Sequence, residues 1–298
     1  MIQPHLHEDS ARQVKQVLWV VFFLNLSVAA AKTFWGYLTG SISMQADGIH
    51  SFLDATSNVV ALIGIWVAFH PPDDTHPYGH RKFETFASFC ISVLLFIACF
   101  NIVKNSYFRF KEAGLVEVPI ESFIVMIATM AVNIWVTRWE GKRAVSLRSE
   151  VLKADSLHTR SDVFSSLSVL ASLVAVKAGY PILDPLIALI IAGIVGKTGF
   201  QILMESSKVL TDYSRIDARE IRELVERIEG IEECHAVRTR GNTNQVYVDL
   251  HIHVAADLHL EKAHRLAHRV EAEIMTKFSD VVEVVVHVEP HIPELEND

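Results

Sequence analysis

The stretch "ADGIHSFLD" (residues 46–54) carries three ionisable side chains, Asp47, His50 and Asp54, at the start of a run that stays largely apolar to Phe69. The hydropathy of that run is typical of a membrane-spanning helix. A charged residue at the centre of such a helix costs roughly 2.5–3.5 kcal/mol on insertion scales, and such residues usually face a bundle interior or a water-filled cavity. The stretch therefore predicts a polar site inside a membrane domain.

The rest of the chain divides by composition. Half of its 298 residues are hydrophobic, and the long apolar runs lie almost entirely before about residue 205. The remainder has the composition of a charged globular domain, so we expect a membrane domain followed by a soluble tail. The predicted parts are a cytoplasmic N-terminal segment (1–16), a transport domain (17–206) and a cytoplasmic domain (207–298).

Charge and cysteine content exclude other classes of protein. The formal net charge of −8 gives no reason to expect nucleic-acid binding. The chain has three scattered cysteines (Cys90, Cys99 and Cys234), too few for a disulfide framework. Its polar N-terminus does not resemble a cleaved signal peptide.

Windows of about 20 apolar residues predict six membrane spans. They cover residues 17–38, 43–69, 84–108, 119–138, 151–177 and 181–206. Basic residues near the span ends gather on one side, which predicts cytoplasmic termini in the inner (plasma) membrane. That side carries Arg12, Lys15, Arg81, Lys82, Arg138, Lys142, Arg143, Arg148 and Lys153, and the other carries Lys104, Arg109, Lys111 and Lys177. The alternative, a soluble protein with buried hydrophobic helices, explains neither the six runs nor the one-sided basic loops.

The opening stretch occurs twice. Ala46-Asp47-x-x-His50-x-x-x-Asp54 recurs as Ala154-Asp155-x-x-His158-x-x-x-Asp162, with every match offset by 108 residues. In each copy the histidine and the second aspartate are four residues apart and share one helix face. The predicted orientation makes the two spans antiparallel, so the copies can approach each other about a pseudo-two-fold axis, as in inverted-repeat transporters.

The two copies together offer two imidazoles and two carboxylates. This ligand set suits a tetrahedral Zn²⁺, and its nitrogen ligands argue against Ca²⁺ and Mg²⁺. We therefore predict a metal site formed by His50, Asp54, His158 and Asp162. The alternative is a pair of interhelical hydrogen bonds. Asp47 and Asp155 lie one turn from the histidines and are not predicted as ligands.

A second candidate site lies in the cytoplasmic loop "HPPDDTHPYGHRKFE" (70–84). Its prolines interrupt the helix, and Asp73, His76 and His80 then offer three metal ligands within eight residues. A solvated polar loop is the alternative interpretation.

These three motifs resemble the cation diffusion facilitator family of divalent-metal transporters, and most closely its bacterial iron/zinc efflux branch. The resemblance runs from about residue 12 to residue 290. It implies a homodimer that exports Zn²⁺ or a similar ion from the cytoplasm in exchange for protons, without enzymatic activity or a cofactor. It assigns His50, Asp54, His158 and Asp162 to the transport site and Asp73, His76 and His80 to a loop site.

The resemblance also bears on the choice of metal. Many iron/zinc-type members carry Asp where His50 stands here, and a His/Asp pair on both helices is similar to the zinc-preferring pattern. Manganese-type members typically carry Asn or Asp at that position. Zinc is therefore the predicted cargo, with Fe²⁺, Cd²⁺ and Co²⁺ as alternatives.

The tail reads as a small α+β domain. Asp217-x-x-Glu220 resembles a capping box that opens a helix to about Glu229. Residues 244–254 alternate strictly between apolar and polar, as in a strand with one buried face. With a strand near 234–240, a helix over 260–278 and a strand over 281–290, the order is αββαβ, that of the family's ferredoxin-like tail.

Eight of the fifteen histidines follow residue 208, which makes the tail a candidate metal-binding domain. The resemblance implies that a regulatory metal there bridges or braces two tails. Its ligands map onto His235, His251, His264, His287 and Glu289. The other histidines, interpreted as solvated surface residues, are His253, His259, His268 and His291.

The predicted function is secondary transport of a divalent metal. Metal binding requires neutral histidine and ionised aspartate, so it releases protons and can be coupled to them. The histidines are the predicted proton carriers. One alternative is a membrane-bound metal sensor or scaffold without transport. A metalloenzyme at the loop site is weakly supported, because only Glu84 stands near it as a catalytic base.

Overall fold

A computed structural model describes residues 4–39, 42–111, 120–177 and 183–291. The side chains of some helical residues inside these ranges are not described, among them those of residues 42–50, 53 and 54. The chain divides into two compact units, one spanning residues 3–207 and the other the residues from 208 on.

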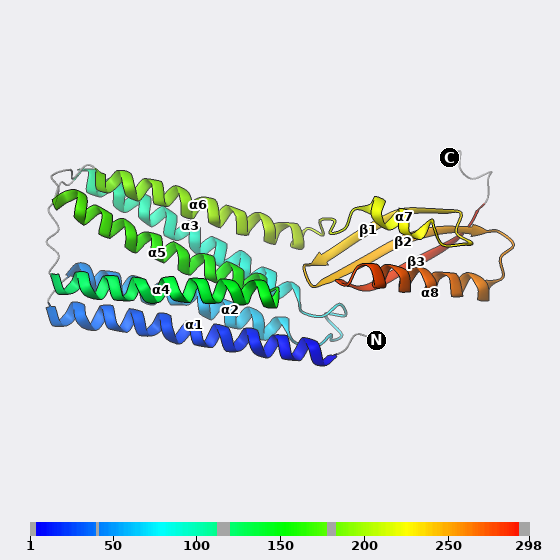
Figure 1. Cartoon of the computed structure of the whole chain (residues 1–298), viewed down its shortest axis with the longest axis horizontal. Coiled ribbons are helices and arrows are strands. Elements are labelled where there is room, and N and C mark those ends of the chain that lie inside the picture. Colours follow the sequence, from blue (N-terminus) through cyan, green and yellow to red (C-terminus); the bar gives the residue numbers. More distant parts are fainter. Residues whose placement is uncertain (1–3, 40–41, 112–119, 178–182, 292–298) are drawn as a thin grey trace. The chain divides into compact units, whose positions relative to one another are not determined.

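The first unit is a bundle of long helices (Figure 1). They are α1 (Pro4–Thr39), α2 (Ile42–Ala68), α3 (Lys82–Lys111), α4 (Ile120–Leu147), α5 (Glu150–Lys177) and α6 (Leu183–Leu210). Consecutive helices run in opposite directions (Figure 1), so α2 and α5 are antiparallel. Helix α2 contacts α1, α3 and α5, and α5 also contacts α3 and α4.

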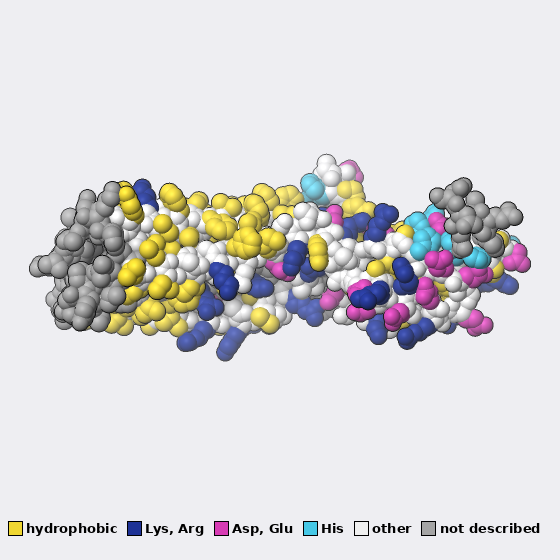
Figure 2. All heavy atoms as spheres, turned by 90° about the horizontal axis from the view of Figure 1, so that it is seen from above, with side chains coloured by type: hydrophobic (Ala, Val, Ile, Leu, Met, Phe, Trp, Pro, Cys, Tyr) yellow, Lys and Arg dark blue, Asp and Glu magenta, His cyan; other side chains and the backbone are white. Residues whose placement is uncertain are grey.

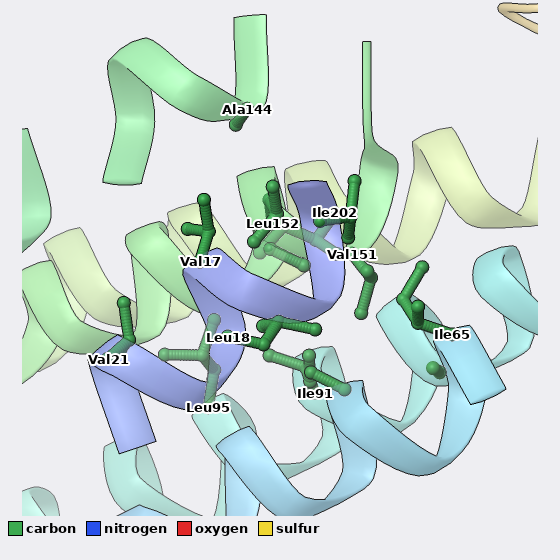
Figure 3. Close-up of a cluster of buried hydrophobic side chains, with 14 of the residues drawn as sticks. Val17, Leu18, Val21, Ile65, Ile91, Leu95, Ala144, Val151, Leu152 and Ile202 are labelled. Carbon is green, nitrogen blue, oxygen red and sulfur yellow. The ribbon is translucent and has the colours of Figure 1, made fainter. Parts of the chain in front are cut away.

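Aliphatic side chains form the bundle core (Figure 3). Leu18 of α1, Ile65 of α2 and Leu95 of α3 are fully buried there. Large apolar side chains also cover much of the outer surface of the bundle (Figure 2), Trp19, Trp66 and Phe100 among them. An apolar exterior around an apolar core is expected where lipid replaces water as the solvent.

Among the described residues, four helices are long and apolar enough to cross a membrane. Their spans are Arg12–Trp35, Lys82–Phe108, Phe123–Leu147 and Leu186–Leu210. Helix α2 contributes a shorter apolar segment, Ala55–Ala68. The count of six spans stays a prediction, because many residues of α2 and α5 have side chains that the structure does not describe.

The helices extend beyond the predicted apolar windows. Helix α1 begins at Pro4 rather than near residue 17, and α4 continues to Leu147 rather than ending near residue 138. Polar residues at a span end do not interrupt the backbone hydrogen-bond ladder, so a hydropathy window marks the apolar part of a helix and not its ends.

The second unit has the predicted αββαβ order. Its elements are α7 (Ala218–Val225), β1 (Glu233–Asn242), β2 (Gln245–Ala255), α8 (Leu260–Lys277) and β3 (Val281–His291). The sheet order is β1-β2-β3, with β1 antiparallel and β3 parallel to β2. Asp217 caps α7 by accepting a hydrogen bond from the Arg219 backbone N–H, and the helix ends at Val225, one turn earlier than predicted.

The two faces of this sheet differ in what they contact. Along β2 the burial alternates strictly, as predicted. The buried residues Val248, Leu250 and Ile252 share a core with residues of both helices, including Ile221 of α7 and Val270 of α8. The opposite face, which carries His251 and His253, therefore points away from both helices.

A bulge in β1 sets which of its side chains point to which face. The register between β1 and β2 shifts between His235 and Arg238, and Ala236 there has a φ of 49°. Cys234 before the bulge and Thr239 after it are both buried, five positions apart. Because strand side chains alternate with period two, only an inserted residue lets both of these side chains reach the core.

Candidate metal centres

The copy of the repeat on α5 pairs a buried histidine with a partly buried aspartate. Nδ1 of His158 lies 3.8 Å from Oδ2 of Asp162, one turn further along the same helix. His158 is buried and the Asp162 side chain is 22% exposed. The matching side chains on α2, those of His50 and Asp54, lie outside the described residues, as does the side chain of Asp47.

Asp155 lies in a buried polar network. Asn58 of α2 donates a hydrogen bond to Oδ2 of Asp155. Asn25 of α1 donates to Oδ1 of Asn58 at 2.8 Å, and Glu140 of α4 is fully buried next to Asp155. Asp155 thus joins α5 to α2. Its exclusion from the ligand set stays a prediction.

Sequence reasoning singled out Asp155 but missed its partners. The available signal was the occurrence of Asn25 and Asn58 inside apolar runs, where polar residues mark interhelical contacts or ion pathways. Glu140 lies in a charged stretch just after the fourth predicted span, where no such signal exists. Asn58 also lies one turn after Asp54, on the same face of α2.

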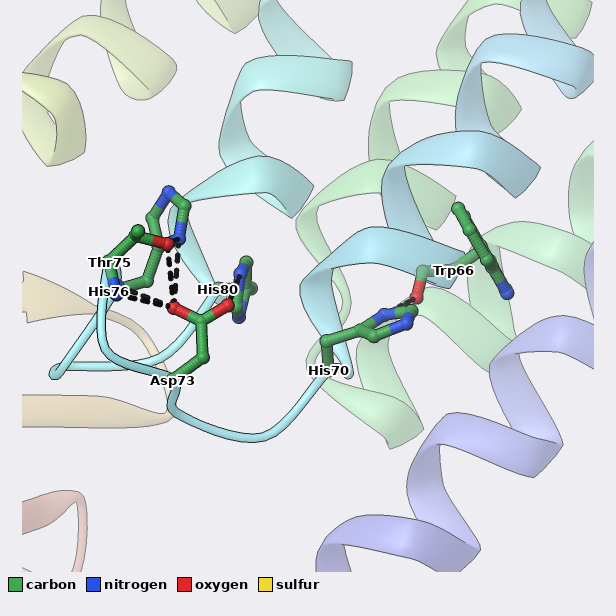
Figure 4. A network of polar contacts seen from close by, with 6 residues as sticks. All are labelled: Trp66, His70, Asp73, Thr75, His76 and His80. Atoms are coloured by element: carbon green, nitrogen blue, oxygen red, sulfur yellow. Dashed lines mark hydrogen bonds and ion pairs between the residues drawn. The ribbon is translucent and has the colours of Figure 1, made fainter.

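The structure brings the three predicted loop ligands together (Figure 4). Nδ1 of His76 lies 3.3 Å from Oδ1 of Asp73, and Nε2 of His80 lies 3.4 Å from Oδ2 of the same carboxylate. Asp73 accepts hydrogen bonds from the Thr75 hydroxyl and from the backbone N–H groups of Thr75 and His76. One ligand atom from each of the three residues lies within 4.8 Å of the other two.

The hydrogen bonds in this loop also change the pKa of Asp73. Those from Thr75 and His76 lower the pKa of Asp73 to about 2, so the carboxylate is ionised and able to bind a cation at cellular pH. His80 is buried, and its Nδ1 has no hydrogen-bond partner among the described residues. Glu84, the catalytic base of the metalloenzyme alternative, is not among the three clustered ligands. It accepts a hydrogen bond from Ser149 at 2.6 Å, which holds its side chain at the start of α3.

Glu289 is the centre of a histidine cluster on the exposed face of the tail sheet. Its Oε1 lies 3.0 Å from Nδ1 of His251 and 3.4 Å from Nε2 of His287. Its Oε2 lies 3.2 Å from Nε2 of His235 and 3.2 Å from Nε2 of His253. Figure 2 shows histidine side chains gathered on this unit.

The cluster includes four of the five predicted tail ligands. Burial raises the pKa of Glu289, but the hydrogen bond from His251 and the neighbouring imidazoles outweigh burial and hold it below its ordinary value. The fifth predicted ligand, His264, is not near Glu289 in the same chain. It lies on α8, which packs on the other sheet face, and its Nε2 is 3.2 Å from Nε2 of His268.

The histidines interpreted as surface residues have different environments. His259 caps α8 by accepting a hydrogen bond from the Glu261 backbone N–H, and His268 lies 2.8 Å from a Glu271 carboxylate oxygen. Nδ1 of His291 lies 3.7 Å from Oε2 of Glu232. His253, in contrast, is 18% exposed and belongs to the Glu289 cluster, so its interpretation as a solvated surface residue is wrong.

A helical bundle with an apolar exterior and an internal histidine–aspartate pair, together with a sheet face rich in histidine, is typical of a membrane protein that handles metal cations. A family model of the cation efflux transmembrane domain matches residues 18–211, and one of the cation efflux protein cytoplasmic domain matches residues 214–291. The chain therefore belongs to the cation diffusion facilitator (cation efflux) family, and the predicted family resemblance is confirmed.

Three curated relatives match this chain over most of their own length. The chain is 30% identical to "Uncharacterized transporter MJ0449" of Methanocaldococcus jannaschii, over 93% of this chain and 99% of that protein. It is 29% identical to the manganese efflux system protein MneS of Bacillus subtilis, over 89% and 91% of the two chains. The magnetosome protein MamB of Magnetospira sp. is 28% identical, over 92% and 94%.

Solved structures also match the tail. One is the cytosolic domain of a cation diffusion facilitator family protein, with 26% identity and a TM-score of 0.23, over 24% of this chain and 86% of that one. Together with the family models, the relatives define the activity of this protein as efflux of divalent metal cations, a transport function and not an enzymatic one.

Proposed function

We propose that this protein exports Zn²⁺ from the cytoplasm in exchange for protons, through a site formed by His50, Asp54, His158 and Asp162. The working molecule is a homodimer in the plasma membrane with both termini cytoplasmic. Residues 17–206 form its transport domain and residues 207–298 its cytoplasmic domain.

The observation that carries the proposal is the pair of buried His158 and partly buried Asp162 on a helix that contacts α2, where the same motif recurs. The hydrogen bond between Asn58 and Asp155 supplies the register of the two antiparallel helices. Positions 54 and 50 lie about one and two turns before Asn58, and His158 and Asp162 about one and two turns after Asp155. This register puts both copies at the same two levels of the bundle, as a shared four-ligand site requires.

The ligand types favour zinc. Two imidazole nitrogens and two carboxylate oxygens match the number and kind of ligands that zinc takes in tetrahedral sites. Manganese prefers oxygen ligands, although two of the relatives are named for manganese efflux. Fe²⁺, Cd²⁺ and Co²⁺ accept similar ligands and remain the other cargoes to compare.

Proton coupling follows from the chemistry of the same ligands. A metal ion displaces protons from histidine and aspartate when it binds, and protons that enter from the other side of the membrane displace the metal. Histidine changes its protonation state close to cellular pH, so His50 and His158 are the proposed proton carriers.

Zinc flux into proteoliposomes with an imposed pH gradient tests the transport site. Asp54→Ala and Asp162→Ala should each abolish most of the flux, whereas Asp257→Ala, which removes an exposed tail carboxylate, should leave it unchanged. Wild-type flux in both site variants would refute the site and favour a sensor or scaffold. Flux that does not respond to the pH gradient would refute antiport alone, and the same assay with Mn²⁺, Fe²⁺, Cd²⁺ and Co²⁺ tests selectivity.

The loop and the tail have proposed accessory roles. Asp73, His76 and His80 would bind cytoplasmic metal, and His235, His251, His287 and Glu289 would bind a regulatory ion in each tail. His264, on the other side of the sheet, could join such a set only from a second chain, so its proposed role depends on the homodimer.

A further inference from the structure

Two buried carboxyl groups meet where α4 packs on α5. Glu140 and Asp155 are both fully buried, and their carboxyl groups are in hydrogen-bond contact. Both oxygens of Glu140 and Oδ1 of Asp155 nevertheless have no hydrogen-bond donor among the described residues. An ionised carboxylate can only accept hydrogen bonds, so two ionised groups cannot supply each other with a donor. The contact between Glu140 and Asp155 therefore requires a proton.

We propose that Glu140 is a neutral carboxylic acid that donates its proton to Asp155 and thereby holds α4 on α5. A protonated carboxyl group has one O–H donor. Oδ2 of Asp155 accepts a hydrogen bond from Asn58, which leaves Oδ1 as the available acceptor. One proton between the two groups gives a partner to that oxygen and to one oxygen of Glu140. A hydrogen bond from a neutral acid to a carboxylate is charge-assisted and stronger than one between neutral groups.

The surroundings of the pair favour one shared proton over two negative charges. Two carboxylates in contact repel each other in a low-dielectric interior, so one of them holds a proton. In the part of the chain that the structure describes, no lysine, arginine or histidine forms an ion pair with either group. Asp155 is the group that stays ionised, because Asn58 and Ser57 of α2 also donate hydrogen bonds to it. Glu140 has no such donors among the described residues.

The place of Asp155 in the chain makes Glu140 a positioning residue for transport. Asp155 lies about one turn before His158 on α5, and its partner Asn58 lies about one turn after Asp54 on α2. Glu140 adds α4 to this contact as a third helix. It acts through Asp155 on the position of α5 and is not itself a metal ligand. This role requires only that the chain transports a cation, so it does not rest on the proposed cargo or on proton exchange.

The alternative is an ionised Glu140. It would then carry protons during transport, or it would bind a cation together with Asp155, because carboxylate oxygens are common cation ligands. Both of these roles need a side chain at position 140 that can lose its proton. Glutamine separates them from the proposed role, since its amide keeps an N–H donor on a side chain of the same length and cannot ionise.

Infrared spectroscopy of the full-length chain in detergent detects the proton directly. At neutral pH, wild type should have a carbonyl band of a protonated carboxylic acid that Glu140→Gln lacks. Glu223→Gln, which removes an exposed carboxylate of α7, should keep every such band. In proteoliposomes, Glu140→Gln should carry the cation that wild type transports fastest, and at the wild-type rate. Glu140→Ala removes the donor and should lose most of that flux.

Two results would overturn the proposal. Identical protonated-carboxyl bands in wild type and Glu140→Gln would show that Glu140 is ionised. A flux as low in Glu140→Gln as in Glu140→Ala would show that position 140 has to ionise. Both tests rest on Glu140→Gln, so they hold even where Glu140→Ala does not fold. Asp162→Ala should lose flux but keep the infrared band of Glu140, so failure of the proposed transport site is distinguishable from failure of this proposal.

Discussion

At Gly64, helices α2 and α3 approach each other closely enough to exclude a side chain. A Cβ atom at Gly64 would lie 2.3 Å from Cβ of Ala87 and 3.4 Å from the Phe83 carbonyl oxygen. Non-bonded carbon atoms are in favourable contact at about 3.5–4.0 Å. Because neither Cβ can rotate away, Gly64→Ala has to separate the two helices by roughly an ångström or more.

Two opposing terms set the magnitude of the effect. Overpacking a close-packed interior costs about 1–3 kcal/mol. Replacing glycine by alanine inside a helix gains about 1 kcal/mol. The net expectation for Gly64→Ala is a loss of up to about 2 kcal/mol in the free energy of unfolding. A Cβ added at Gly193 of α6 would meet no heavy atom of the described residues within 4 Å, so Gly193→Ala retains only the gain.

Thermal unfolding of the purified protein in detergent measures this difference. Gly64→Ala should unfold at a lower temperature than wild type, and Gly193→Ala at the same temperature or higher. Adding Ala87→Gly to Gly64→Ala should restore much of the loss, because the double variant moves the methyl group across the same interface. If Gly64→Ala is as stable as Gly193→Ala, the packing of α2 on α3 described above is wrong.

Three further predictions concern the buried network, the loop and the tail. Asn58→Leu removes the hydrogen bond that Asn58 donates to the buried Asp155 and should cost about 1–3 kcal/mol of unfolding free energy in the same assay; wild-type stability would contradict the network. Asp73→Asn should remove one zinc ion from the loop in chelator titrations, whereas Asp74→Asn, its exposed neighbour, should not. Burial raises the pKa of Cys234 to about 11, so in a Cys90→Ala, Cys99→Ala background maleimide should label the chain at pH 8 only after unfolding. The folded-state pKa is the higher one, so this thiol's contribution to stability is complete below pH 9 and is lost as the pH rises to about 11.

Local patterns in the chain predicted a large part of the fold. The alternation along β2 was sufficient to identify a strand with one buried face, and the structure has that burial pattern. The spacing of histidine and aspartate in α5 was sufficient to place both on one helix face. Helix ends were harder to predict, because hydropathy measures the apolar part of a helix and not the extent of its hydrogen bonding.

The bulge in β1 shows why other features were not predictable. One inserted residue moves every later side chain of a strand to the opposite face of the sheet. Nothing in the residues near Ala236 marks that position as the one with positive φ. Without the bulge, the side chains before and after it could not both point where the structure has them. The interpretation of His253 failed for a related reason, because its partners Glu233 and Glu289 come from other strands.

By itself, the sequence determined the family, the αββαβ tail, the repeated histidine–aspartate motif and the three-residue loop cluster, because each of these rests on residue types and spacing within short segments. Only the tertiary structure decided which distant groups meet. Asn58 and Asp155 are 97 residues apart in the chain, and their hydrogen bond sets the register between the two copies of the motif. Glu233 and His253 face each other because of strand register. Contacts of both kinds depend on how whole helices and strands pack, and local spacing does not encode that packing.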